Sequence, residues 1–138
     1  MKIKYKALLL AAGFGTRLKP LTNEKPKCLM EIGDKPLLEH WLEKLEQSYC
    51  EEVLINTHYL SEQVEDFLRK RSNKKLKIIT TYESSLLGTA GTLKQNINFF
   101  KKNDLGILIH ADNYTKLNLI DLINAHKKRN EKTILTMA

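Results

Sequence analysis

Five short apolar runs alternate along the chain with longer segments of helical periodicity. The runs are rich in strand-forming residues and lie near Lys6 to Ala12, Glu52 to Thr57, Leu76 to Tyr82, Leu105 to Ala111 and Thr133 to Met137. Strands separated by helices pair in parallel, and the helices then cover the faces of the sheet. The alternation therefore predicts an α/β fold with a mostly parallel sheet.

Four helices are expected between and after the strands. One helical face is traced by Leu37, Leu38, Trp41, Leu42 and Leu45, and another by Val64, Phe67 and Leu68. Gly88 to Phe100 and Leu119 to Arg129 supply two more. A length of 138 residues, without repeats or a flexible linker, suits a single compact unit, residues 1–138. Because the run at Thr133 to Met137 has no following crossover, we expect the fold to be incomplete at its C-terminal end.

Composition narrows the classes of partner. A net charge of +7 attracts phosphate-bearing molecules in general, but the Lys and Arg residues are scattered, so we expect no nucleic-acid partner. The run Ala7 to Ala12 is too short for a signal peptide or a membrane span, which predicts a buried strand and no membrane partner. Cys28 and Cys50 lack CxxC spacing, which favours a reduced, cytoplasmic setting.

A loop containing two glycines follows the first strand, at the edge where open α/β sheets bind ligands. Gly13 and Gly15 allow backbone N–H groups to approach phosphate oxygens closely. A dinucleotide-binding fingerprint would need glycine at the position of Leu18, and the Gly-Lys-Ser/Thr of a Walker loop is absent. A phosphate cradle and a plain strand-to-helix turn are the interpretations that remain.

Two cations on the same loop favour the cradle. Arg17 can grip phosphate oxygens with two N–H groups, whereas Lys27 acts as a point charge. Pro20 and Pro26 restrict the loop between and beside them, so the cations are expected to be held in place before a substrate binds. Either cation taken alone is more typical of a solvated surface residue.

The loop resembles the signature of the sugar-1-phosphate nucleotidyltransferases, or NDP-sugar pyrophosphorylases, and among them most of all the mannose-1-phosphate guanylyltransferases. The similarity rests on the segment 10–18 (Leu-Ala-Ala-Gly-Phe-Gly-Thr-Arg-Leu) with Pro20-Leu21-Thr22, Pro26-Lys27 and Lys35-Pro36-Leu37. It implies a Rossmann-like, doubly wound sheet with helices on both faces, of which this chain is the nucleotide-binding part without the sugar-binding remainder. It further implies catalytic roles for Arg17 and Lys27, and nucleotide contacts from Leu10, Ala11, Ala12, Gly13, Gly15 and Thr16.

The segment 82–91, Tyr-Glu-Ser-Ser-Leu-Leu-Gly-Thr-Ala-Gly, resembles the family's base-recognition segment. The resemblance adds Glu83, Gly88 and Thr89 to the expected nucleotide contacts. A carboxylate accepts hydrogen bonds, and guanine presents adjacent N1–H and N2–H₂ donors, so Glu83 suits guanine. The alternative for Glu83 is an exposed carboxylate at the end of a strand.

Asp112 ends the fourth apolar run, where a metal-bound phosphate would be met. The resemblance makes it a ligand of Mg²⁺, a hard cation that is often held by one or two carboxylates together with substrate oxygens. An aspartate in this position is also typical of a turn or helix cap. We expect structural roles for His58, His126 and His110, the last at a core or edge position. The spacing of the histidines gives no support for a zinc site.

The implied reaction joins an NTP, with GTP favoured, and a sugar 1-phosphate to give an NDP-sugar and pyrophosphate. A cytidylyl-, uridylyl- or thymidylyltransferase of the same fold, and a non-catalytic nucleotide-binding module, remain as alternatives, and a homo-oligomer is compatible with the sequence. Because the sugar-binding part is expected to be missing, we predict that the chain alone binds nucleotide weakly and turns over poorly.

Overall fold

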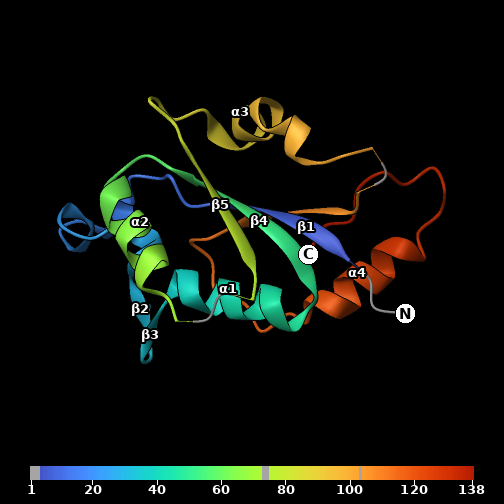
Figure 1. Ribbon diagram of the computed structural model, residues 1–138, viewed down its shortest axis with the longest axis horizontal. Helices are drawn as coiled ribbons and strands as arrows, with labels where there is room; N and C mark the ends of the chain where they lie inside the picture. The colour runs from blue at the N-terminus through green and yellow to red at the C-terminus, as the bar shows by residue number, and fades with distance from the viewer. Residues whose placement is uncertain (1–3, 73–74, 103) are drawn as a thin grey trace.

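The computed structural model describes residues 4–72, 75–102 and 104–138 and is built around a four-stranded parallel sheet (Figure 1). Its strands are β1 (Tyr5–Leu10), β4 (Cys50–Thr57), β5 (Lys77–Tyr82) and β6 (Gly106–His110), in the spatial order β5-β4-β1-β6. The chain moves outward from β1 to β4 and β5 and then returns to the other side of β1 for β6. This reversal makes the sheet doubly wound and places its switch point beside β1. The predicted Rossmann-like class is confirmed.

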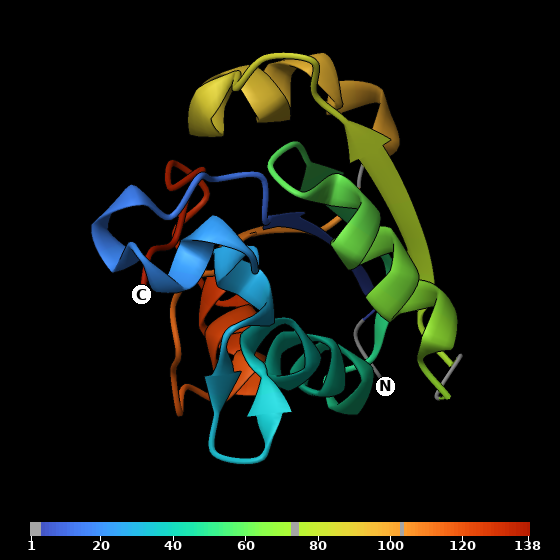
Figure 2. The same ribbon diagram turned by 90° about the vertical axis from the view of Figure 1, so that its left-hand side faces the viewer.

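Helices cover both faces of the sheet (Figure 2). On one face lie α1 (Leu37–Gln47) and α4 (Leu119–Lys127), and α2 (Ser61–Lys70) contributes Val64 to the same core. On the opposite face lies α3 (Gly88–Gln95), followed by a 3₁₀ turn at Ile97–Phe99. None of the described helices is long and apolar enough to span a membrane.

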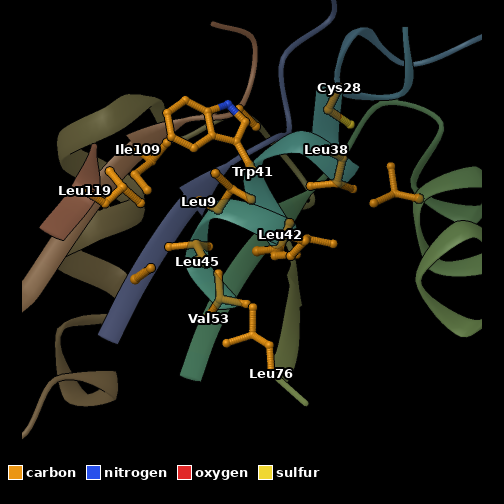
Figure 3. Close-up of a cluster of buried hydrophobic side chains, with 14 of the residues drawn as sticks. Leu9, Cys28, Leu38, Trp41, Leu42, Leu45, Val53, Leu76, Ile109 and Leu119 are labelled. Carbon is orange, nitrogen blue, oxygen red and sulfur yellow. The ribbon is translucent and has the colours of Figure 1, made fainter. Parts of the chain in front are cut away.

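The main core lies between the sheet and α1 (Figure 3). Alternate residues of each strand point to one face, so Leu9, Val53 and Ile109 face the same way from β1, β4 and β6. They pack against the apolar face of α1, whose members are Leu37, Leu38, Trp41, Leu42 and Leu45, as the sequence periodicity predicts. The packing fixes the strand ends, and hence the loops that follow them.

The loop between β1 and α1 contains more structure than the sequence predicts. Three 3₁₀ turns occupy Thr16–Leu18, Leu21–Asn23 and Lys27–Leu29. After them, β2 (Glu31–Ile32) and β3 (Lys35–Pro36) pair to form a small antiparallel ribbon. Elements of two or three residues are too short to produce a periodic pattern of apolar residues. Tertiary contacts rather than periodicity therefore determine them.

The expected fifth strand at Thr133 to Met137 is wrong. The structure shows no regular hydrogen-bonding pattern over residues 133–138, and the Thr133 N–H instead closes a turn on the Asn130 carbonyl. Ile134 is 89% exposed. An apolar run forms a strand only where a neighbouring strand can accept its backbone hydrogen bonds, and this segment pairs with none of the described strands. Two expected helices are also shorter, because α3 ends at Gln95 and α4 at Lys127.

Candidate active site

The carboxyl ends of the strands open into one cleft of about 490 Å³. All twelve residues predicted for the site line it: Leu10, Ala11, Ala12, Gly13, Gly15, Thr16, Arg17, Lys27, Glu83, Gly88, Thr89 and Asp112. They come from three segments that are far apart in the sequence, namely the loop after β1, the segment that enters α3, and the end of β6. The fold thus brings the predicted residues together, while their individual roles stay predictions.

The loop after β1 is held in shape at Gly15. This residue has a φ of +64°, and a Cβ atom there would lie 2.8 Å from Cγ2 of Thr22. The buried Thr22 donates its hydroxyl hydrogen to the Gly15 carbonyl at 2.8 Å. Tyr59 in turn donates from its hydroxyl to the Thr22 carbonyl, also at 2.8 Å. Glycine is therefore required at position 15 by both backbone conformation and space.

The ring of Phe14 ties the same loop to the turn after β4. It meets the His58 ring edge-on at a centroid distance of 5.2 Å and lies 5.4 Å from the ring of Tyr59. The His58 ring also makes a 2.7 Å hydrogen bond, from Nδ1, to the Glu83 carbonyl oxygen. His58 thus has a structural role, as the sequence predicts, and it joins two of the segments that form the cleft.

The two predicted catalytic cations differ in their surroundings. Arg17 is exposed, lines the cleft and makes no hydrogen bond or ion pair with any residue in the described ranges. Lys27 donates from Nζ to Oδ2 of Asp112 at 2.7 Å. Among the described residues, the guanidinium of Arg17 is therefore without a partner, whereas the ammonium of Lys27 is paired with Asp112, the predicted metal ligand.

Asp112 is positioned by contacts between α1 and the chain that follows β6. The indole N–H of Trp41 donates to the Asn113 carbonyl at 2.8 Å, and Nζ of Lys44 donates to the Leu117 carbonyl at 3.1 Å.

The buried Cys28 lies near Asp112, and burial raises the pKa of its thiol to about 12. This thiol is therefore neutral at pH 7 and is not activated for nucleophilic attack.

Glu83 is buried rather than exposed, with 3% of its surface accessible. Its Oε1 accepts hydrogen bonds from Nδ2 of Asn56 at 2.9 Å and from the Thr92 hydroxyl, and its Oε2 accepts from the Leu87 N–H at 3.1 Å. Burial would raise the pKa of Glu83, but these three donors outweigh it and hold the pKa below its ordinary value. The cleft is therefore lined by an ionised carboxylate that can only accept hydrogen bonds.

Six further residues line the cleft without having been predicted from the sequence: Leu18, Cys28, Asn56, Leu86, Thr92 and His110. Asn56 ends the apolar run of β4, just as Asp112 follows that of β6, and the same reasoning about strand ends could have identified it. His110 is an exposed residue at the sheet edge that faces the cleft. Thr92 lies within a helix and carries no comparable signal in the sequence.

The fold and the cleft define a doubly wound α/β domain whose main cleft lies at the carboxyl edge of the sheet. The chain belongs to the nucleotidyl transferase family, whose model matches residues 6–138.

Relatives with different substrates resemble the chain. An N-acetylmuramate alpha-1-phosphate uridylyltransferase of Caulobacter vibrioides is 41% identical over 91 residues, which cover 64% of this chain and 38% of the relative. A mannose-1-phosphate guanyltransferase of Yarrowia lipolytica is 35% identical over 133 residues, covering 94% and 37%. The structure of HddC from Yersinia pseudotuberculosis complexed with GMP-PN has a TM-score of 0.77 and 26% identity, covering 90% of this chain and 55% of that one. The chain thus spans well under half the length of these two curated relatives.

Proposed function

We propose that the chain carries the nucleotide site of an enzyme that transfers a nucleotidyl group from an NTP to a sugar 1-phosphate. The observation that carries this proposal is the single cleft shared by the phosphate loop, the entrance to α3 and Asp112. The relatives named above, a uridylyltransferase and a guanyltransferase acting on sugar phosphates, support it. Both cysteines are free thiols, in keeping with the cytoplasmic setting that we propose for the enzyme.

The reaction needs charge stabilisation more than proton transfer. An oxygen of the sugar 1-phosphate attacks the α-phosphorus in line, the bond from that phosphorus to the bridging oxygen breaks, and pyrophosphate leaves with the electron pair. The attacking oxygen is already anionic near pH 7, so no general base is required. Arg17 and Lys27 stabilise the negative charge on the phosphates, and backbone N–H groups of the loop hold the triphosphate.

The donor set fits a magnesium ion that is held jointly by protein and substrate. The Asp112 carboxylate is a hard oxygen ligand at the edge of the cleft, and the described residues contain no group of three or more His, Cys, Asp or Glu that could enclose a metal. Mg²⁺ is commonly bound by one or two carboxylates, with phosphate and water oxygens completing its shell. When bound, the ion would supply positive charge to the reacting phosphates.

We propose guanine as the favoured base. The ionised Glu83 accepts hydrogen bonds and retains capacity at Oε2, to which guanine can direct either of its adjacent donors, N1–H or N2–H₂. Uracil and thymine offer a single donor, N3–H, which lies between two carbonyl oxygens. A carboxylate repels these two oxygens. The bound nucleotide of the HddC structure, GMP-PN, supports this choice.

A panel of nucleotides tests the proposal. The chain, in molar excess over the nucleotide, is incubated with Mg²⁺, mannose 1-phosphate and one α-³²P-labelled nucleotide: GTP, UTP, dTTP, CTP or ATP. Labelled NDP-sugar is then separated by chromatography and counted. We expect labelled product to form fastest from GTP. Parallel thermal shifts measure binding, because a ligand of the native state raises its apparent stability. Greater stabilisation by another nucleotide than by GTP would overturn the choice of guanine, and the absence of stabilisation by any nucleotide would overturn the proposed nucleotide site.

A further inference from the structure

The buried side chain of Asn56 connects the two halves of the nucleotide site. It lies near the carboxyl end of β4, between β1 on one side and β5 on the other. Its Oδ1 accepts a hydrogen bond from the Ala11 N–H at 2.7 Å. Its Nδ2 donates to Oε1 of Glu83 at 2.9 Å and to the Thr92 hydroxyl oxygen at 3.3 Å. One carboxamide thus contacts the start of the phosphate loop and the carboxylate of the base segment.

Only a side chain with an acceptor at one end and a donor at the other can make these contacts. The partners fix the orientation of the amide, because the Ala11 N–H must face an oxygen and the Glu83 carboxylate must face an N–H. Aspartate in its ionised form would place two carboxylates against each other. Leucine or alanine would leave the Ala11 N–H without its partner.

The contacts also determine which oxygen of Glu83 is available. Oε1 accepts from both Asn56 and Thr92, whereas Oε2 accepts only from the Leu87 N–H among the described contacts. A carboxylate oxygen has two lone-pair sites, so Oε2 retains capacity for a ligand. The orientation of Oε2, the oxygen of Glu83 that can still accept a hydrogen bond, is therefore set by the same contacts that connect Glu83 to the phosphate loop through Asn56.

We propose that Asn56 is a positioning residue that holds the acceptor oxygen of Glu83 and the phosphate-loop amide of Ala11 in one fixed relationship, so that base and phosphates are bound as a unit. This inference rests on the proposed function, because it assumes that a nucleotide occupies the cleft. It adds a residue that acts on both ends of the nucleotide through other groups.

The test uses Asn56→Asp, which preserves the shape of the side chain. When protonated, the introduced carboxyl can donate O–H to Glu83 and accept from the Ala11 N–H, as the amide does. When ionised, it repels Glu83, and this repulsion raises its own pKa. We expect Asn56→Asp to bind Mg²⁺-GTP about as tightly as the wild type does at pH 5.5. At pH 8 we expect it to bind Mg²⁺-GTP about tenfold or more weakly than the wild type.

The wild type at each pH corrects for other titrations. The groups that face this site are Glu83 after β5, His58 after β4, and the cleft residues Arg17, Lys27, His110 and Asp112; all are unchanged by the substitution. A purely structural role of Asn56 would lower stability without making the affinity ratio depend on pH. Parallel pH profiles of Asn56→Asp and the wild type would therefore overturn the inference.

A second pair of variants covers the case in which Asn56→Asp does not fold at pH 8. Asn56→Ala removes the contacts to both segments, whereas Thr92→Val removes a donor to Glu83 and leaves the Ala11 N–H bonded. We expect Asn56→Ala to weaken GTP and inorganic tripolyphosphate alike, by about tenfold, and Thr92→Val to weaken only GTP. Tripolyphosphate affinity unchanged by Asn56→Ala would overturn the inference. If the wild type binds no nucleotide, the proposed function itself fails.

Discussion

The ammonium of Lys27 lies 2.7 Å from Oδ2 of Asp112, across 85 residues of sequence. The two side chains are partly exposed, at 30% and 42%. The contact pairs a predicted phosphate ligand with a predicted metal ligand. A phosphate at Lys27 and a metal at Asp112 each compete with this ion pair, so the two binding events are expected to favour one another.

Removing the ammonium should free the carboxylate. We expect Lys27→Met to bind Mn²⁺, a probe for Mg²⁺, about two- to fivefold more tightly without nucleotide, because a partly exposed ion pair contributes roughly 0.4–1 kcal/mol. Electron paramagnetic resonance of free Mn²⁺ measures the affinity. Lys25→Met is the matched control, since Lys25 pairs with Glu31 and does not line the cleft. Equal Mn²⁺ affinities of Lys27→Met and the wild type would contradict the prediction.

Gly15→Ala should destabilise the fold by about 1–3 kcal/mol, because alanine is strained at positive φ and its Cβ would meet Thr22. Urea unfolding measures the change. Gly13→Ala is the control, since a Cβ at Gly13 meets no heavy atom within 4 Å. Combining Gly15→Ala with Thr22→Ser, which removes the clashing Cγ2 and keeps the hydroxyl, should restore part of the loss. An equal cost at positions 13 and 15 would argue against this account of the loop.

Arg17→Ala should abolish nucleotidyl transfer and leave stability within about 0.5 kcal/mol of the wild type, because Arg17 is exposed and has no partner among the described residues. Labelled-product formation and urea unfolding measure the two effects. Arg69→Ala removes the same charge from α2, away from the cleft, and should transfer at the wild-type rate. Wild-type transfer by Arg17→Ala would exclude the role assigned to this guanidinium.

Glu83→Gln should destabilise the protein by about 1–3 kcal/mol at pH 7, because it weakens hydrogen bonds from Asn56, Thr92 and Leu87 to a charged acceptor. The folded pKa of Glu83 lies below its ordinary value of 4.5, so the ionised form contributes its full stability above that pH. As the pH falls below 4.5 and through the folded pKa, the wild type loses this contribution and the two proteins converge. Urea unfolding from pH 7 to pH 3 tests this, and a constant difference over that range would contradict it.

Much of the fold could be predicted because the main strands and helices are long enough to show their periodicity. The run before Asn56 and the stripe from Leu37 to Leu45 each indicated the correct element. The run at Thr133 to Met137 misled, because apolar character alone does not supply a neighbouring strand. The turns within the loop were missed because they depend on contacts such as that of Tyr59 with Thr22.

The sequence by itself determined the α/β class, the glycine loop with Arg17 and Lys27, and the polar residues that follow the strands. These features are local, and each follows from residue type and spacing. Only the tertiary structure decided that Lys27 meets Asp112 and that Glu83 is buried among Asn56, Thr92 and the Leu87 N–H. Such contacts depend on strand order and register, which bring distant segments to one edge of the sheet and which no local pattern encodes.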